Sequence, residues 1–248
     1  MSTGLTVPFT VIIPARLAST RLPGKMLLDV GGKPLLQHAY EAALGSKAAK
    51  VIIATDNRKI ADTAKEFNAE CIMTSAEHVS GTERIAETVN ILGYPENAII
   101  VNVQGDEIGM PSELINQVAE LLAAETDRQM ATLCELITSQ AEINNPNVVK
   151  VVFGENKQAL YFSRSPIPWH KDGTPCKYYR HIGIYAYRAG FLEQYSKLPK
   201  CDIEQAESLE QLRALYHGIN ILVDIARFKP GIGIDTESDL QRAREMFG

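Results

Sequence analysis

The chain has 248 residues, of which 45% are hydrophobic and 22% are charged, the composition of an ordinary soluble globular protein. Acidic residues outnumber basic residues by 30 to 25, so a general nucleic-acid surface, which needs a basic excess, is not expected. No apolar run approaches the ~20 residues of a membrane span, the N-terminus shows no signal-peptide pattern, and four scattered cysteines indicate free thiols in the cytoplasm.

Strands and helices are expected to alternate in the first half of the chain. Continuous apolar runs typical of buried strands lie at residues 9–13, 50–55, 70–73 and 98–103. Helical patterns follow them at residues 34–44, from 56 or 57 to 67, at 81–92 and at 111–124. This alternation predicts an α/β fold with a Rossmann-like, doubly wound, mostly parallel sheet, in which ligands lie at the carboxyl ends of the strands.

The second half of the chain has a different pattern. Strands are expected at residues 130–136, 148–153, 159–163 and 180–187 without full helices between them, which predicts a smaller mixed β extension. A helix at residues 204–217, a strand at 220–225 and a helix at 237–246 complete the chain. Because no linker divides the sequence, we expect a single domain, residues 1–248, with an extension at about residues 130–200.

A basic segment, PARLASTRLPGK at residues 14–25, connects the first expected strand to the first expected helix. Its three cations, Arg16, Arg21 and Lys25, stand among small and hydroxyl residues at the position where α/β proteins bind phosphate groups. A solvated basic loop is the alternative, because neither GxxxxGK[ST] nor GxGxxG is present. The segment therefore favours a polyanion site only together with features elsewhere in the chain.

Two aspartates provide such features. Asp106 and Asp235 each end an apolar run just before a helix, where an aspartate is either a helix cap or a magnesium ligand. Two of them beside a basic loop favour a metal–phosphate site, and Glu107 is either a third acid or a solvated neighbour. The pattern favours phosphoryl-type chemistry, and it leaves open whether a phosphoryl or a nucleotidyl group is transferred.

Seven segments in this order resemble the 3-deoxy-manno-octulosonate (Kdo) cytidylyltransferase family, and they extend from about residue 9 to the C-terminus. They are PARLASTRLPGK, HVSGTER, VNVQGDE, ALYFSRSPIPW, RHIGIYAYRAGF, LEQLR and GIDTESDL. The resemblance implies a cytoplasmic enzyme that converts CTP and Kdo to CMP-Kdo and pyrophosphate with Mg²⁺, for the inner core of lipopolysaccharide. It also implies a homodimer formed through the extension.

The resemblance also implies roles for individual residues. Arg16, Arg21 and Lys25 would hold the CTP phosphates, with Lys25 also offsetting charge on the transferred phosphorus. Asp106 and Asp235 would hold Mg²⁺, with Asp106 also at the CTP site. The cytidine would lie near Ser80, Gly81 and Arg84, and the sugar-acid pocket would be lined by Gln104, Arg164, His181, Tyr185, Glu210 and Gln211.

Within that pocket, Arg164 and His181 are reasonable partners for the Kdo carboxylate, and Glu210 and Gln211 suit sugar hydroxyls. The alternatives for single residues are a hydrogen-bonded core histidine at His181, a solvated helix face at Glu210 and packing at Tyr185. The remaining histidines have no metal-binding spacing and receive no role; they are His38, His78, His170 and His217.

The sequence departs from the family after GDE, where Ile108-Gly109-Met110 stands in place of the usual proline directly after the glutamate. The added glycine frees the backbone beside Asp106. Two alternatives to a Kdo enzyme therefore stay open. One is a cytidylyltransferase for a related 2-keto sugar acid, such as 8-amino-Kdo or a sialic acid, and the other is a non-catalytic paralogue that binds nucleotide or sugar.

Overall fold

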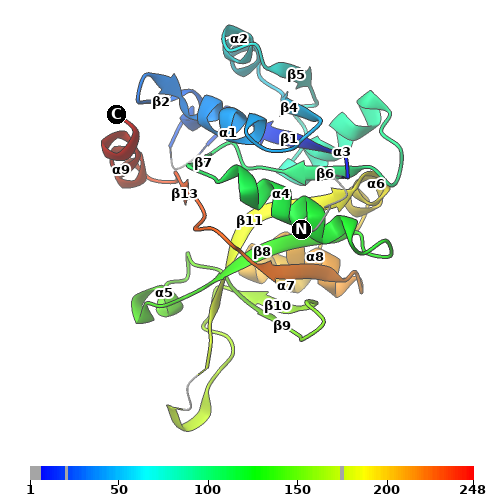
Figure 1. Ribbon diagram of the computed structural model, residues 1–248, viewed down its shortest axis with the longest axis vertical. Helices are drawn as coiled ribbons and strands as arrows, with labels where there is room; N and C mark the ends of the chain where they lie inside the picture. Colours follow the sequence, from blue (N-terminus) through cyan, green and yellow to red (C-terminus); the bar gives the residue numbers. More distant parts are fainter. Residues whose placement is uncertain (1–6, 20–21, 174–175) are drawn as a thin grey trace, which may run out of the picture.

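The computed structural model describes residues 7–19, 22–173 and 176–248, and a central nine-stranded sheet runs through them (Figure 1). The strand order is β10-β9-β11-β6-β1-β4-β5, with β8 paired to both β11 and β12. The strands are β1 (Phe9–Ala15), β4 (Lys50–Thr55), β5 (Glu70–Met73), β6 (Ile99–Asn102), β8 (Met130–Leu136), β9 (Lys150–Phe153), β10 (Ala159–Ser163), β11 (Tyr179–Arg188) and β12 (Ile221–Ile225). Strands β6, β1, β4 and β5 are parallel neighbours, which confirms the predicted α/β sheet, and β11 runs antiparallel to β6.

Helices cover both faces of this sheet. They are α1 (Leu35–Leu44), α2 (Arg58–Glu66), α3 (Gly81–Leu92), α4 (Ser112–Ala123), α5 (Gln140–Asn144), α6 (Ala189–Ser196), α7 (Asp202–Glu207), α8 (Gln211–Tyr216) and α9 (Glu237–Phe247). Along β1, Val11 and Ile13 pack with α1, α2 and α4, whereas Ile12 packs with α3, α6 and α8. Because successive strand residues point to opposite faces, one fully apolar strand supplies two cores.

The predicted helix at residues 204–217 is wrong as a single element. The structure has α7 and α8 instead, separated by Ser208 in the left-handed region at φ 51°. A serine pays a steric cost there, and the break turns Glu210 and Gln211 toward the sheet. Two further helices, α5 and α6, were not predicted from the sequence.

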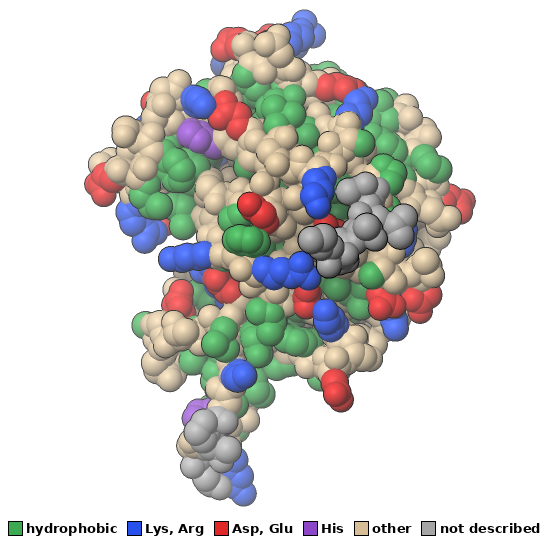
Figure 2. Space-filling view, viewed as in Figure 1, with side chains coloured by type: hydrophobic (Ala, Val, Ile, Leu, Met, Phe, Trp, Pro, Cys, Tyr) green, Lys and Arg blue, Asp and Glu red, His purple; other side chains and the backbone are tan. Residues whose placement is uncertain are grey.

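A long segment projects away from the sheet between β10 and β11, at the bottom of Figure 1. Strands β8, β9, β10 and β11, which we expected in the extension, all belong to the central sheet, and the projecting part is the connection between β10 and β11. Figure 2 shows hydrophobic side chains gathered on the surface near the base of this segment. In the part of the chain that is described, no helix is long and apolar enough to cross a membrane.

A two-residue ladder joins distant parts of the chain beside the sheet. Strand β7 (Glu107–Ile108) pairs antiparallel with β13 (Ile232–Gly233), and the Ile234 N–H donates to the Asp106 carbonyl at 2.9 Å. The remaining short elements are the 3-10 turns η1 (Lys25–Leu27) and η2 (Lys171–Gly173) and the pair β2 (Asp29–Val30) and β3 (Lys33–Pro34). The ladder places the end of the GDE loop next to the start of α9.

Candidate active site

A lysine and two aspartates meet at the carboxyl end of the sheet. The Lys25 Nζ donates to the carboxylates of Asp106 and Asp235, at 3.1 Å for Oδ1 of Asp235, and to the Ile234 carbonyl at 3.2 Å. Gly24, in the left-handed region at φ 67°, turns the chain into η1 and directs the buried Lys25 inward. Burial disfavours the charged ammonium, but Asp106 and Asp235 outweigh it and raise the pKa of Lys25.

The same three residues indicate how a divalent cation fits here. The Lys25 ammonium takes the position of a cation between the two carboxylates. Among the described residues, no group of three or more His, Cys, Asp or Glu side chains is arranged to hold a metal. Two carboxylates that converge on one cation suit Mg²⁺, which keeps several water ligands and takes others from substrate phosphates.

A polar cavity of about 390 Å³ opens in front of this cluster. The residues predicted for CTP that the structure describes all line it, and so does Asp235, predicted for the metal; the CTP residues are Arg16, Lys25, Ser80, Gly81, Arg84 and Asp106. Arg16 is exposed at the end of β1, as a residue that meets a phosphate chain should be. Arg21, the third predicted cation, lies outside the described residues.

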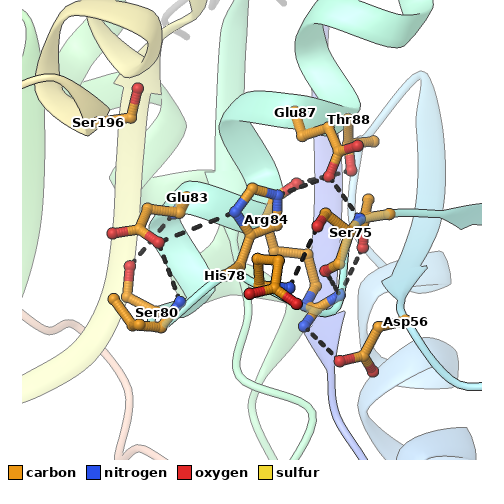
Figure 3. A network of polar contacts seen from close by, with 12 residues as sticks. Asp56, Ser75, His78, Ser80, Glu83, Arg84, Glu87, Thr88 and Ser196 are labelled. Carbon is orange, nitrogen blue, oxygen red and sulfur yellow. Dashed lines mark hydrogen bonds and ion pairs between the residues drawn. The ribbon is translucent and has the colours of Figure 1, made fainter.

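The N-terminus of α3 is fixed by polar contacts at the edge of this cavity (Figure 3). Ser80 caps the helix by accepting from the Glu83 N–H at 3.2 Å, and its hydroxyl donates to Glu210 Oε1 at 3.0 Å. The Arg84 side chain is only 3% exposed, and its guanidinium donates to Asp56 Oδ2 at 3.0 Å and to the Thr74 hydroxyl. Arg84 therefore supports the cavity wall with its charge already paired.

His78 also lines this cavity, although the sequence analysis gave it no role. Its Nε2 lies 2.5 Å from Glu87 Oε2, which also accepts from the Ser75 N–H at 2.8 Å (Figure 3). Burial opposes the charged form of Glu87, but these two hydrogen bonds lower its pKa. The signal in the sequence was the HVSGTER segment itself, of which only the serine, glycine and arginine were used.

A second cavity, of about 250 Å³, adjoins the first and shares Thr82, Asn102, Gln104 and Glu210 with it. It contains five of the six residues predicted for the sugar acid: Gln104, His181, Tyr185, Glu210 and Gln211. Seven further lining residues were not predicted from the sequence: Thr82, Asn102, Met130, Gly183, Tyr187, Tyr195 and Leu209. Because the two cavities are connected, a ligand in one can contact a ligand in the other.

Neutral side chains dominate this second cavity. The rings of His181, Tyr185 and Tyr187 follow one another at centroid distances of 5.3 and 5.7 Å. Burial lowers the pKa of His181 to about 3 and raises the pKa values of Tyr185 and Tyr187, so all three are uncharged at neutral pH. A neutral His181 offers no positive charge to a carboxylate, the partner that we expected for it.

Glu210 is the acid at the junction of the two cavities, and it is half-buried rather than on a solvated helix face. Burial raises its pKa, and the hydrogen bond from Ser80 opposes that rise. Two buried polar atoms near it, Asn102 Oδ1 and the Tyr185 hydroxyl oxygen, have no hydrogen-bond partner within the described part of the chain. Buried polar atoms without partners are rare in proteins, so these two indicate a place for a polar ligand.

Arg164 lies apart from both cavities. Its Nε donates to the Glu207 carbonyl at 2.6 Å, and its Nη atoms donate to the carbonyls of Pro146 and Ser208 at 3.0 and 3.4 Å. In this arrangement Arg164 ties the α7–α8 break to the base of the projecting segment. Its contact with a sugar carboxylate stays a prediction.

Glu107, which the sequence left as a third acid or a solvated neighbour, is neither exposed nor part of the cavity walls described. A Cβ at Gly183 would lie 3.3 Å from Glu107 Oε1, so the glycine lets this carboxyl pack against β11. Burial first, and then repulsion from Asp106, raises the pKa of Glu107 to about 7 against the effect of Arg180. Glu107 is therefore a packed acid behind the metal-binding candidates.

Comparison with known proteins gives a consistent result. A sequence model of the cytidylyltransferase family matches residues 10–221. Proteins named 3-deoxy-manno-octulosonate cytidylyltransferase from Hahella chejuensis and Idiomarina loihiensis are each 51% identical to this chain, over 96% and 97% of it and over 97% and 98% of their own lengths.

Two solved structures extend the comparison. A CMP:2-keto-3-deoxy-manno-octonic acid synthetase complexed with CTP is 41% identical and superimposes with a TM-score of 0.91, covering 97% of this chain and 98% of its own. A putative glucose-1-phosphate thymidylyltransferase from Bacillus anthracis shares the fold. It is 18% identical to this chain and superimposes with a TM-score of 0.66, covering 96% of this chain and 95% of its own.

Proposed function

Because the chain belongs to the 3-deoxy-manno-octulosonate cytidylyltransferase family, we propose that it transfers the cytidylyl group of CTP to Kdo, giving CMP-Kdo and pyrophosphate. The observation that carries this proposal is the pair of connected cavities with Lys25, Asp106 and Asp235 at the carboxyl end of the sheet. One cavity suits a polyphosphate and the other suits a polyhydroxylated acid. The product would activate Kdo for the inner core of lipopolysaccharide.

The chain's own charges explain how CTP would be positioned. Arg16 and Lys25 lie on the wall of the polar cavity, where their cations attract the triphosphate. A sugar hydroxyl would attack the α-phosphorus and lose its proton to water as the new P–O bond forms, while the bond from the α-phosphorus to the bridging oxygen of the β-phosphate would break and pyrophosphate would leave. The Lys25 ammonium, held by Asp106 and Asp235, can offset negative charge on the transferred group.

Magnesium is part of this proposal. Asp106 and Asp235 would hold it, because both carboxylates already reach one cation. When bound, Mg²⁺ neutralises charge on the reacting phosphate and on the leaving pyrophosphate. The short β7–β13 ladder would keep its two ligands together, since Ile234 is hydrogen-bonded to the Asp106 carbonyl.

We also propose that the protein is a cytoplasmic homodimer. The second half of the chain exposes large apolar side chains around the projecting segment, with Trp169 85% and Leu160 64% exposed, together with Leu136. A second copy that covers them would remove this apolar area from water. The four cysteines described are all free, as thiols are in a reducing compartment.

The test is pyrophosphate release from CTP and Mg²⁺, with and without Kdo, by the wild type and Asp106→Asn. We expect release that depends on Kdo and that falls by roughly 10²- to 10³-fold in Asp106→Asn, the usual cost of removing one group that stabilises transition-state charge. Asp62→Asn, on the exposed face of α2, is the matched control and should keep wild-type rates.

Other outcomes identify the alternatives. Release with 8-amino-Kdo or a sialic acid but not with Kdo would keep the reaction and change the substrate. No release with any of these acids, in a protein that still binds CTP, would make the chain a binding paralogue and overturn the proposal.

A further inference from the structure

A buried threonine stands behind the histidine of the second cavity. Thr132 on β8 is fully buried and pairs with Tyr185 across the ladder to β11, beside an irregularity in β11 between Ile182 and Tyr185. Its Oγ1 lies 2.7 Å from the Ile184 carbonyl oxygen, 3.2 Å from the Ile182 carbonyl oxygen and 3.1 Å from Nε2 of His181. The irregular strand thus turns two backbone carbonyls toward one hydroxyl.

Counting protons fixes the direction of each hydrogen bond. A threonine hydroxyl has one proton, and a carbonyl oxygen can only accept. If the Thr132 proton pointed at His181, lone pairs of Oγ1 would face the Ile184 oxygen at 2.7 Å with no proton between them. The hydroxyl therefore donates to the carbonyls, chiefly to that of Ile184 at the shorter distance, and it accepts from His181, whose Nε2 must carry the ring proton.

The other ring nitrogen is left for a ligand. His181 is half-buried and lines the second cavity, and its Nδ1 has no hydrogen bond within the described residues. The ring packs between Phe162 and Tyr185, with ring centroids 5.1 and 5.3 Å away, which restricts its rotation. Because burial keeps the pKa of His181 far below neutrality, Nδ1 is unprotonated and can only accept a hydrogen bond.

We propose that Thr132 is a positioning residue that holds His181 as its Nε2–H tautomer, so that Nδ1 accepts a hydrogen bond from a hydroxyl group of the sugar substrate. The inference rests on the proposed function, because that function supplies the polyhydroxylated substrate. It assigns His181 to a hydroxyl rather than to the carboxylate, whose lone pairs would face the lone pair of Nδ1.

The tautomer can be measured in the wild-type protein without substrate. Proton–nitrogen correlation spectra of the ¹⁵N-labelled protein separate the two neutral tautomers and the imidazolium. We expect His181 to show a protonated Nε2 and a bare Nδ1 at pH 7, with its signals identified by their loss in His181→Asn. His38 is an internal reference, because its Nε2 lies 2.8 Å from the Val30 carbonyl oxygen and must donate to it. An Nδ1–H tautomer or an imidazolium at His181 would overturn the proposal.

Two variants of Thr132 then connect the tautomer to the substrate. Thr132→Val keeps the shape and removes the hydroxyl, whereas Thr132→Ser keeps the hydroxyl. We expect Thr132→Val to show mixed tautomers and a KM for Kdo raised roughly five- to tenfold, the size of one lost hydrogen bond, with the KM for CTP changed less than about twofold. Thr132→Ser should restore both the tautomer and the KM for Kdo.

The outcomes separate this inference from the proposed function. The proposed role of Thr132 would be wrong if Thr132→Ser behaved like Thr132→Val, or if Thr132→Val left the tautomer of His181 and the KM for Kdo unchanged. If Kdo is not a substrate, the wild-type spectrum still decides the tautomer, and the same KM comparison is made with whichever sugar acid supports pyrophosphate release.

Discussion

The two connected cavities use polar residues in opposite ways. In the first, Lys25, Asp106 and Asp235 are close enough to pair as ions, and the two carboxylates raise the pKa of the lysine. In the second, burial leaves His181 and Tyr185 uncharged, so they can offer a ligand hydrogen bonds but no ion pair. A fixed charge has the same sign in nearly any setting, whereas the role of a histidine or tyrosine depends on what surrounds it.

The supports of the two cavities differ as well. Loop ends and the β7–β13 ladder hold the charged cluster, whereas the ring of His181 is held by the strand β11, by Thr132 and by neighbouring rings. Coulomb energy falls slowly with distance, but a hydrogen bond weakens steeply when its angle is wrong. We therefore expect the charged cavity to respond to changes of charge and the neutral cavity to small changes of geometry.

The largest effect on stability is expected from Lys25→Met. The change leaves Asp106 and Asp235 facing one another without their cation, and breaking a buried pair costs about 3–5 kcal/mol. Both aspartates are partly exposed, so we expect a loss of about 1–3 kcal/mol in the free energy of unfolding. Urea unfolding with and without MgCl₂ measures it, and Mg²⁺ should restore the loss in the variant.

A matched control is Lys33→Met. Lys33 pairs with Glu41 at 2.7 Å on the exposed surface, where an ion pair contributes at most ~1 kcal/mol, and Mg²⁺ should not affect this variant. If Lys25→Met proved as stable as the wild type and insensitive to Mg²⁺, the two aspartates would not be a cation site. The first cavity would then not differ from the second through its ion pairs.

Much of the charged cavity could be predicted from the sequence. Asp106 and Asp235 each follow an apolar strand, and Lys25 ends a basic loop, so residue type and position in the chain already indicate their chemistry. The ladder that brings the two aspartates together has only two residues on each strand. This is too short for the alternation of apolar and polar residues that identifies a strand in a sequence. Their proximity therefore needed the structure.

The neutral cavity was harder to predict, for physical reasons that can be named. The family resemblance predicted His181 and Glu210 as individual residues. The orientation of Glu210, however, depends on the helix break at Ser208, and the spacing of apolar residues does not reveal that break. The protonation of His181 depends on burial and on Thr132, a residue 49 positions away. Arg164 is the opposite case. Its residue type suggested a contact with the substrate, but in the structure its guanidinium donates hydrogen bonds to backbone carbonyls.

A smaller effect, on the pH dependence of stability, is expected at His181. Its pKa is about 3 in the folded protein and about 6.5 in the unfolded chain, so the unfolded chain binds more protons between these values. Stability therefore rises with pH across that window and is lost as the pH falls below about 6.5. His181→Gln removes this dependence. At pH 5, we expect the wild type to lose about 1 kcal/mol more than the variant, relative to pH 7.5, after allowance for partial exposure.

Urea unfolding at pH 7.5 and pH 5 makes this comparison, and His170→Gln serves as the control because His170 is exposed. The control should lose as much stability as the wild type on acidification. Equal losses in the wild type and His181→Gln would mean that His181 titrates normally, which would remove the neutral character that distinguishes the second cavity.

An effect of similar size is expected at Gly109, beside the charged cluster, in the segment that we expected from the sequence to differ from the family. Gly109 has φ 72°, and a Cβ there would lie 3.1 Å from Phe247 Cζ. Gly109→Ala should therefore cost about 1 kcal/mol of stability. Gly233→Ala, on β13 opposite Glu107, is the control, since its Cβ would meet no atom within 4 Å and its φ is not positive.

Activity in Gly109→Ala then tests the contrast between the cavities directly. If the charged cluster acts mainly through Coulomb attraction, a shift of a few tenths of an ångström at Asp106 changes that energy little, and the rate should stay within about twofold of the wild type. A large rise in the Mg²⁺ concentration needed for half-maximal rate, absent from Gly233→Ala, would contradict this. The charged cavity would then depend on geometry as closely as the neutral one does, and Gly109 would be part of how Asp106 is placed.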